Sequence, residues 1–294
     1  RTIFIADAHL QQESDHVYMA MLRFLEELRG NTDTLYIMGD FFEFWIGYPE
    51  VPFNHYLPVL NSLQSLRESG TDIVYFEGNH DFHMGAFFSE TLRATIFPGP
   101  ATLNIAGKRC YLCHGDQANP ADIPYRLLRF LFHSSFTRWL THIVPPSTAC
   151  AIAERMGRKG RYHLHLKGEN PAFRNILRQY ASVQFGKGHD IVIAGHFHIP
   201  FTETDPGPPE KRLVSLGAWA CGLHYAELVD NEILLKNSSD LFQSLQPIRT
   251  AQDTYLPSHQ ALAQTPSHRY RRRGIRGRQA AAFHRLNSSN CLAG

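Results

Sequence analysis

Ile73-Val-Tyr-Phe76 leads directly into Glu77-Gly-Asn-His-Asp81, so that an apolar run of strand length ends in a polar turn. A short apolar run bounded by turn residues is typical of a buried strand. Other strand-like runs end in the same way, with Asp or His within a residue or two of the last apolar position. The chain has five such polar clusters: Asp7-Ala-His9, Gly39-Asp40, Gly78-Asn-His-Asp81, His114-Gly-Asp116 and Gly195-His-Phe-His198.

The first 76 residues alternate between strand-like and helix-like patterns. In order, the patterns are strand, helix, strand, helix and strand, at residues 2–6, 14–29, 34–38, 55–69 and 72–76. A βαβαβ order predicts parallel strands joined by right-handed crossovers. Ligands of such sheets collect at the carboxyl ends of the strands, which is where Asp7, Asp40 and Asn79 fall.

The pattern changes after a predicted helix near residues 84–93. Short strand-like runs then dominate, and two of them lead into His114 and His196. The predicted strands of this half are 101–105, 109–113, 191–194, 212–216, 224–229 and 232–236. We therefore predict an α/β fold of four layers, αββα, in which two sheets pack face to face with helices outside.

A helical pattern interrupts these strands at residues 118–185. Its stretch 125–144 is very apolar and stops at Pro145-Pro146, and a break at Ser134-Ser135 would make two short helices of it. We interpret 118–185 as a helical cap inserted in a catalytic domain of residues 1–236. From 237 to 294 the apolar periodicity fades and Arg accumulates, which predicts a tail of low order.

The composition is that of a globular protein with a substantial core: 43% of the 294 residues are hydrophobic. Residues 250–294 hold seven Arg and one Asp, so the rest of the chain is mildly acidic and gives no reason to expect nucleic-acid binding. The tail could contact anionic lipid or nucleic acid, or have no defined role. No apolar run reaches the ~18 residues of a membrane span, and no signal peptide is visible. The sequence begins at Arg1 on a predicted strand, so we expect a residue or two before it.

The five Cys are odd in number and show no disulfide framework, which favours a reducing, cytosolic location. Cys110 and Cys113 form a C-x-x-C within a predicted strand. Because side chains alternate along a strand, this spacing places them on opposite faces. We therefore expect buried thiols rather than a zinc or redox pair.

The five clusters carry the ligand types of a site for two divalent cations. Asp7 and His9 could hold one cation and a carboxylate at Asp40 could bridge to a second. One cation would take Asp7, His9, Asp40 and His198, and the other Asp40, Asn79, His114 and His196. Ligation by His, Asp and Asn without Cys favours Mn²⁺, Fe²⁺ or Zn²⁺. Each motif alone is a weak signal, and the inference depends on all five occurring in this order at strand ends.

Such a pair of cations can clamp a phosphate, lower the pKa of a water and stabilise an in-line displacement. His80 would face the substrate as a general acid or as a donor to phosphoryl oxygens, next to the catalytic carboxylate of Asp40. Glu43 lies close enough in sequence to orient a ligand histidine. The sequence therefore predicts a phosphoesterase with His80 and Asp40 as catalytic residues.

The pattern D-x-H, G-D, G-N-H-[DE], H, G-H-x-H resembles that of the calcineurin-like metallophosphoesterases, over residues 2–236. This resemblance implies the four-layer fold with two metal ions. More narrowly, five segments resemble the UDP-2,3-diacylglucosamine pyrophosphatases of lipid A biosynthesis: Gly39-Asp-Phe-Phe-Glu-Phe-Trp-Ile-Gly47, Gly78-Asn-His-Asp-Phe82, His114-Gly-Asp116, Gly195-His-Phe-His-Ile-Pro200 and Leu216-Gly-Ala-Trp219. This narrower resemblance implies an enzyme with two Mn²⁺ ions at the inner face of the cytoplasmic membrane that releases UMP from a UDP-linked diacylated sugar.

The same resemblance implies the residues that contact the substrate. Asn79, His80 and His196 match through their motifs, and Asp122, Tyr125, Arg126 and Lys167 match through the cap. The best-known branch of the family has Arg where this chain has His80. Either His80 does equivalent work, or the chain belongs to a sister branch with another substrate.

The apolar stretch 125–144 favours a lipid substrate, because it offers more apolar side chains than an ordinary surface helix. Part of the set could line an acyl pocket or contact a membrane, and part could pack the cap onto the body. The interleaved Arg126, Arg129 and Arg138 could meet phosphates of the substrate or of the membrane. Two other functions stay open at this point. One is a generic phosphodiesterase or nucleotide pyrophosphatase, and the other is a scaffold that kept the fold and lost catalysis.

Overall fold

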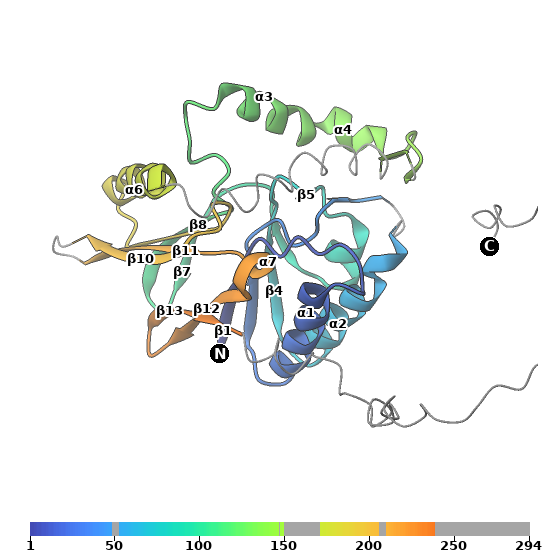
Figure 1. The fold of residues 1–294 in the computed structure, drawn as a ribbon, viewed down its shortest axis with the longest axis horizontal. Helices are drawn as coiled ribbons and strands as arrows, with labels where there is room; N and C mark the ends of the chain where they lie inside the picture. The colour runs from blue at the N-terminus through green and yellow to red at the C-terminus, as the bar shows by residue number, and fades with distance from the viewer. Residues whose placement is uncertain (49–52, 147, 150–170, 206–209, 239–294) are drawn as a thin grey trace, which may run out of the picture. The chain divides into compact units, whose positions relative to one another are not determined.

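The computed structural model describes residues 1–48, 53–146, 148–149, 171–205 and 210–238, all within one compact unit. Its first sheet has six strands in the order β13-β12-β1-β2-β4-β6 (Figure 1). These strands are Glu232–Asn237, His224–Val229, Thr2–Ile5, Thr34–Ile37, Asp72–Phe76 and Thr95–Phe97. Strands β1, β2, β4 and β6 are parallel, which confirms the predicted βαβαβ arrangement.

The second sheet has five strands in the order β10-β11-β9-β8-β7. They are Pro200–Asp205, Lys211–Leu216, Ile191–Ala194, Lys108–Cys113 and Ala101–Ile105. Strands β8, β9 and β11 are parallel, and β7 and β10 pair antiparallel at the edges. A two-stranded pair, β3 (Trp45–Ile46) with β5 (Asp81–Phe82), lies apart from both sheets.

The strand β1 shows how the layers are joined, because its side chains alternate between two cores. Ile3 and Ile5 pack with helices α1 (His16–Leu28) and α2 (Leu57–Glu68). Phe4 faces the other way and packs with Leu112 and Ile193 of the second sheet. This alternation places a helix layer on one face of the sheet and the second sheet on the other.

The outer face of the second sheet is covered by α6 (Pro171–Gly186) (Figure 1). Leu177, Ala181 and Phe185 of this helix pack with Val192 of β9 and Leu213 of β11. The four-layer αββα fold is therefore confirmed. Within the range 118–185, expected as one insertion, α6 forms a layer of this sandwich.

Two further helices lie outside these layers, α3 (Ile123–Phe132) and α4 (Ser135–Leu140). Neither contains a buried residue. The helices separate at the expected break, where the Ser134 hydroxyl accepts a hydrogen bond from the Thr137 backbone N–H and begins α4. Hydrogen bonds from Tyr125 and Arg129 to Asp116 connect α3 to the body.

Four strands were not predicted from the sequence: β3, β5, β6 and β10. The helix expected near 84–93 is one turn of π-helix, Phe87–Thr91. Cys110 packs between the sheets and Cys113 packs on the α6 side, so the C-x-x-C lies on opposite faces as predicted. Among the described helices, none has both the length and the apolar composition needed to cross a membrane.

Candidate metal centre and active site

The predicted ligands follow five parallel strands, β1, β2 and β4 of the first sheet and β8 and β9 of the second. Because the sheets pack face to face, their carboxyl ends meet at one edge of the sandwich. Asp7 and Asp40 are fully or almost fully buried there, at 0% and 2% exposure, and His114 is 3% exposed. The structure thus brings the five sequence clusters into one place.

The first group of side chains consists of Asp7, His9 and His198. One potential ligand atom of each lies within 4.8 Å of the others. Asp7 Oδ1 is 3.2 Å from His198 Nε2, and Asp7 Oδ2 accepts a 2.8 Å hydrogen bond from the backbone N–H of His196. A carboxylate and two imidazoles at this spacing are suited to a divalent transition metal.

The second group consists of Asp40, His114 and His196, again within 4.8 Å of one another. Its centre is Nε2 of His114, which lies 3.2 Å from Asn79 Oδ1, 3.3 Å from Asp40 Oδ2 and 3.3 Å from His196 Nδ1. Four side chains from four strand ends therefore present N or O atoms to one point.

Asp40 lies between the two groups. Its Oδ1 accepts hydrogen bonds of 2.9 Å from the backbone N–H groups of Asn79 and His80. Its Oδ2 is 3.3 Å from His114 Nε2 of the second group and 3.8 Å from His9 Nε2 of the first. One oxygen is thus fixed by the turn, and the other faces both groups, as a bridging ligand requires.

Two ligand histidines are held by their other nitrogen. His114 Nδ1 donates to the Met38 carbonyl at 2.9 Å, and His9 Nδ1 lies 3.2 Å from Glu43 Oε2. Glu43 thus takes the orienting position that the sequence predicted. The buried Nδ1 of His9 has this ion-pair contact but no regular hydrogen bond, and its buried Nε2 has no hydrogen-bond partner among the described residues. A histidine held at one nitrogen, with the other turned inward, is typical of a metal ligand, so the side chains fit a pair of cations.

The backbone at these positions is strained. Asp7, His9, Asp40, His196 and His198 all adopt positive φ, between 44° and 67°. This region is sparsely populated by residues other than glycine, and such strain clusters at functional sites. Five of the seven predicted ligands share it, which supports a common function for them.

The buried carboxylate of Asp81 holds two of the ligand turns together. It accepts hydrogen bonds from the backbone N–H groups of Asp40 (2.9 Å), Phe41 (2.6 Å) and Gly78 (2.9 Å) and from the Tyr75 hydroxyl (2.6 Å). Gly78 is required at this crossing, because a Cβ there would lie 2.5 Å from the Asp40 backbone nitrogen. The sequence contained Asp81 in its motif, but nothing in the pattern indicated this role.

Electrostatics favour a cation at this edge. Burial raises the pKa of the Asp40 carboxyl, but the imidazoles of His114 and His80 outweigh burial and hold it well below its ordinary value. For His114 burial acts in the opposite direction and lowers the pKa, because the charged form of an imidazole is the protonated one. The Asp40 carboxylate outweighs this effect and raises the pKa of His114 to about 10. Both shifts favour an ionised Asp40 beside a protonated His114, and a divalent cation would take the place of that proton.

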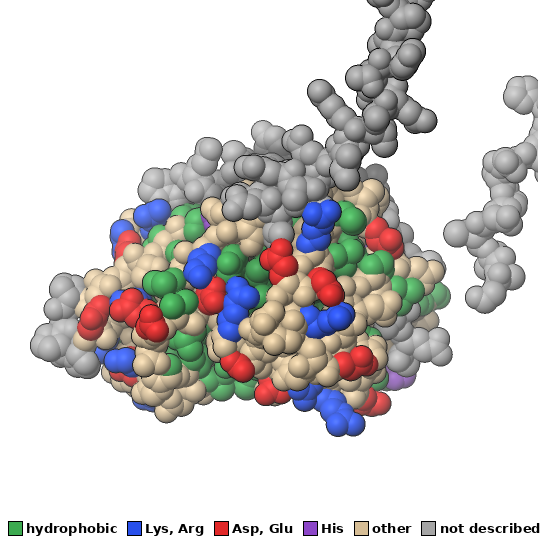
Figure 2. All heavy atoms as spheres, turned by 90° about the horizontal axis from the view of Figure 1, so that it is seen from below, with side chains coloured by type: hydrophobic (Ala, Val, Ile, Leu, Met, Phe, Trp, Pro, Cys, Tyr) green, Lys and Arg blue, Asp and Glu red, His purple; other side chains and the backbone are tan. Residues whose placement is uncertain are grey.

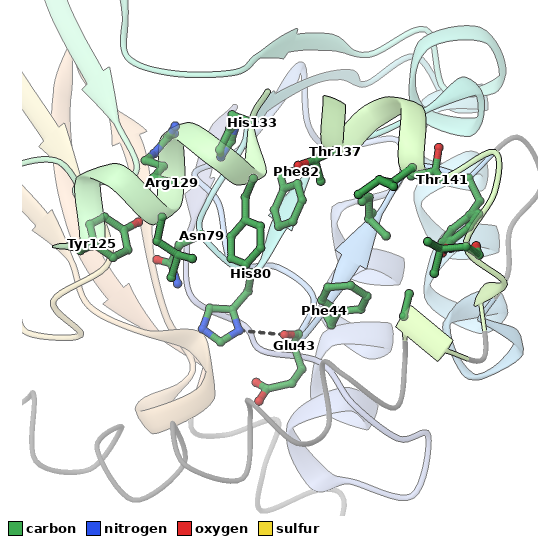
Figure 3. A pocket seen from close by; sticks show the side chains of 17 residues that line it. Glu43, Phe44, Asn79, His80, Phe82, Tyr125, Arg129, His133, Thr137 and Thr141 are labelled. Atoms are coloured by element: carbon green, nitrogen blue, oxygen red, sulfur yellow. Dashed lines mark hydrogen bonds between the residues drawn. The ribbon is translucent and has the colours of Figure 1, made fainter. Parts of the chain in front are cut away.

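A cavity of about 390 Å³ opens beside the two groups of candidate ligands, which we call the metal groups (Figure 3). Asn79 and His80 line it at the metal side, where His80 Nδ1 is 2.8 Å from the Glu43 carbonyl oxygen. The rest of the wall is mainly apolar and comes from the body and from α3 and α4: Phe44, Ile46, Tyr48, Phe82, Leu128, Phe132, Leu140 and Val144. The cavity therefore continues from a polar end into an apolar one.

The cap residues matched by resemblance take different places. Tyr125 lines this cavity, with its ring centroid 6.3 Å from that of His196. The Asp122 side chain caps α3 by accepting from the Tyr125 backbone N–H at 3.1 Å. Arg126 lines a second cavity, which shares Arg129 and His133 with the first, and Lys167 lies outside the described residues. The structure thus brings Tyr125, and not Arg126, to the cavity beside the metal groups.

The sequence pattern indicated no role of its own for Asp116, and it marked Arg129 only as one of three cap arginines that could meet phosphates. Asp116 is 6% exposed and follows His114 by two residues. It accepts a 2.6 Å hydrogen bond from the Tyr125 hydroxyl and a charged hydrogen bond from Arg129 Nε. The sequence signals were the Asp of His114-Gly-Asp116 and the Arg within the apolar cap stretch, and neither indicated that the two residues pair.

Comparison with known proteins agrees with this geometry. The family model for calcineurin-like phosphoesterases matches residues 1–200. A UDP-2,3-diacylglucosamine hydrolase of Aeromonas salmonicida is 32% identical over 227 residues, which are 74% of this chain and 85% of that protein. A protein of the same name from Tolumonas auensis is 30% identical, covering 85% of this chain and 99% of its own length. The chain belongs to the calcineurin-like phosphoesterase family and is a hydrolase.

Proposed function

We propose that this chain is a dinuclear metal-dependent hydrolase that cleaves the pyrophosphate bond of UDP-2,3-diacylglucosamine. Its products would be UMP and 2,3-diacylglucosamine 1-phosphate, in lipid A biosynthesis. The observation that carries the proposal is the cavity, which joins the metal groups at Asn79 and His80 to an apolar wall under α3 and α4. The names of the relatives support the same substrate.

The proposed cations are two Mn²⁺ ions, with Fe²⁺ or Zn²⁺ as alternatives. When bound, they would supply positive charge to the phosphate and lower the pKa of a water. Asp7, His9, Asp40 and His198 would hold one, and Asp40, Asn79, His114 and His196 the other. Asp40 is suited to both cations, because the backbone N–H groups of Asn79 and His80 bond to its Oδ1 and leave Oδ2 facing the two groups.

His80 is proposed to act on the phosphoryl group. The Glu43 carbonyl can only accept a hydrogen bond, so His80 Nδ1 carries the proton between them. Nε2 is then the nitrogen available to the substrate, and it donates when the ring is protonated. An imidazolium in this place would stabilise charge that develops on the phosphoryl oxygens.

The proposed reaction is an attack of water on the α-phosphorus. The bond from that phosphorus to the bridging oxygen breaks, and the bridging oxygen leaves with the sugar phosphate. The new oxygen therefore ends in UMP, and protons not retained by the products pass to solvent. The ionised carboxylates and the inward nitrogens of the histidines position the reactants, which is the main source of rate in phosphoryl transfer.

We further propose that the folded part binds peripherally to the inner face of the cytoplasmic membrane through α3 and α4. Large apolar side chains of these helices are exposed, at 72% for Phe130, 65% for Phe136 and 53% for Trp139. Arg126 and Arg138 on the same helices are also exposed and could meet lipid phosphates. Figure 2 shows Lys and Arg interspersed with Asp and Glu on the face seen from below, so this face gives no support for nucleic-acid binding.

In this proposal residues 1–236 form the catalytic domain and 237–294 the Arg-rich tail. The test of function is to incubate purified protein with Mn²⁺ and UDP-2,3-diacylglucosamine. UMP and the sugar 1-phosphate are expected in equal amounts. Release of nucleotide from soluble phosphodiesters alone would instead identify a generic phosphodiesterase and overturn the lipid assignment.

A further inference from the structure

Arg129 has an unusual place in the cavity beside the metal groups. Among the described residues that line this cavity it is the only Arg or Lys. Its side chain is 11% exposed, although α3 contains no fully buried residue. A cation held this far out of water on a surface helix calls for an explanation beyond packing.

Two groups of the body hold the guanidinium. Arg129 Nε donates to Asp116, whose side chain is 3% exposed, and Nη2 donates to the Pro98 carbonyl at 3.2 Å. The Tyr125 hydroxyl donates to the same Asp116 oxygen at 2.6 Å. A guanidinium has five N–H donors, and these bonds use two of them.

The position of this trio relates it to the metal groups. Tyr125 is in ring contact with His196, with centroids 6.3 Å apart. Tyr125, Arg129 and Asn79 line the same cavity, with the first two on α3 and Asn79 on the body (Figure 3). A substrate with one phosphate at the metal groups and an apolar part in the cavity would therefore share that cavity with Tyr125 and Arg129.

We propose that Arg129 binds the second phosphate of the substrate, the one that leaves with the sugar, and that it makes the site selective for pyrophosphate diesters over diesters with a single phosphate. This inference rests on the proposed function and names the residue that recognises the leaving group. As the bond from the α-phosphorus to the bridging oxygen breaks, the leaving phosphate gains one negative charge. The remaining N–H groups of Arg129 would stabilise that charge.

Asp116 is the positioning residue in this proposal. Its bond to Nε fixes the plane of the guanidinium, since the donors of Arg lie in one rigid plane. It also joins α3 to the turn that carries His114. The alternative is that the Asp116–Arg129 pair only fastens α3 to the body. In that case a change of Arg129 would lower kcat/KM equally for every substrate.

The experiment compares two substrates with the full-length, Mn²⁺-loaded protein. One is UDP-2,3-diacylglucosamine, with two phosphates, and the other is bis(p-nitrophenyl) phosphate, with one. For Arg129→Ala we expect kcat/KM to fall about 100-fold on the first substrate, the size expected for a hydrogen bond to a charged group. On the second substrate the change should stay below about 3-fold, because no leaving phosphate is present. Arg23→Ala, an exposed change on α1, is the matched control and should alter neither value.

Conservative variants keep the test decisive. Arg129→Lys keeps the charge but loses the planar set of N–H donors. Its kcat/KM should fall less than that of Arg129→Ala, and only on the pyrophosphate substrate. Asp116→Asn keeps an acceptor and should show the same selectivity with a smaller loss. If Arg129→Ala does not fold, the Lys and Asn variants carry the comparison. Equal losses on both substrates, or no loss on either, would overturn the role of Arg129.

Failure of the proposed function is distinguishable from failure of this inference. UDP-glucose, which has two phosphates and no acyl chain, serves as a third substrate. Cleavage of UDP-glucose without cleavage of the acylated sugar, with Arg129→Ala still selective, would overturn the lipid assignment and support Arg129. A wild-type protein that cleaves the single-phosphate diester alone would overturn both.

Discussion

The Oδ2 atom of Asp40 lies 3.8 Å from Nε2 of His9, too far for a hydrogen bond, although both side chains are buried. No described residue supplies His9 Nε2 with a hydrogen-bond partner. Buried polar atoms are rarely left in this state, because the cost of losing water is not recovered. A cation between this carboxylate and the imidazole would give His9 Nε2 a partner, and the first two predictions test that arrangement.

The first prediction concerns Asp40 itself. Asp40→Ala removes the oxygen that faces both groups, so we expect kcat to fall on the order of 10³-fold, as for loss of charge stabilisation worth several kcal/mol. The fold should persist, as measured by circular dichroism. Metal analysis should show that the variant retains less than the full complement of cations. Normal turnover by a folded variant would contradict the site assignment.

Glu43 should act through His9 rather than on the substrate. Glu43→Gln keeps the size of the side chain but weakens the partner of His9 Nδ1, which is 3.2 Å away. We expect metal affinity to fall by about 10–100-fold, the usual effect of changing a residue that orients a ligand. Activity should recover at high Mn²⁺ concentration, as titration of activity against metal would show. A loss that excess metal does not reverse would contradict this role.

Two neighbouring leucines on α3 can distinguish the proposed acyl cavity from the proposed membrane-binding surface. Leu128, which is 41% exposed, lines the cavity, whereas Leu127, which is 60% exposed, does not. Leu128→Asp should raise KM for the diacylated substrate about 10-fold or more, the cost of placing a charge in an apolar pocket, and leave UDP-glucose unchanged. Leu127→Asp should weaken co-sedimentation with anionic vesicles and leave turnover of detergent-dispersed substrate intact. Identical behaviour of the two variants would contradict the distinction.

The helix α6 should contribute to the stability of the folded body, unlike α3. Leu177 is fully buried against the second sheet, whereas Leu131 on α3 is 52% exposed. Leu177→Ala is expected to cost about 2–5 kcal/mol of unfolding free energy, and Leu131→Ala less than about 1 kcal/mol. Urea denaturation of the two variants measures both. Equal costs would contradict the assignment of α6 to the sandwich.

The sequence predicted the parallel strands and the place of the ligands because the physics there is local. Strands β1, β2 and β4 are short apolar runs, and the residue after each run falls at the same edge of the sheet whatever the rest of the chain does. The grouping of Asp7, Asp40 and Asn79 follows from that rule, whereas His114 joins them because the second sheet packs against the first. The strands β6 and β10 were missed, because β6 has three residues and β10 begins with Pro200.

Other features depend on contacts between distant segments, which no local pattern contains. Asp81 bonds to backbone N–H groups 40 and 41 residues earlier in the chain. Asp116 and Arg129 are joined across a turn whose path the sequence does not specify. The helix α6 packs on the outer face of the second sheet, and the sequence does not show which sheet face a helix will pack against. In each case the residue was visible, but its partner was set by the tertiary fold.

The most direct test of the proposed reaction is to run it in H₂¹⁸O with Mn²⁺-loaded protein and UDP-2,3-diacylglucosamine. Attack on the α-phosphorus predicts one ¹⁸O atom in UMP and none in 2,3-diacylglucosamine 1-phosphate, as measured by mass spectrometry of both products. Label in the sugar phosphate, or the absence of UMP, would contradict the proposed reaction.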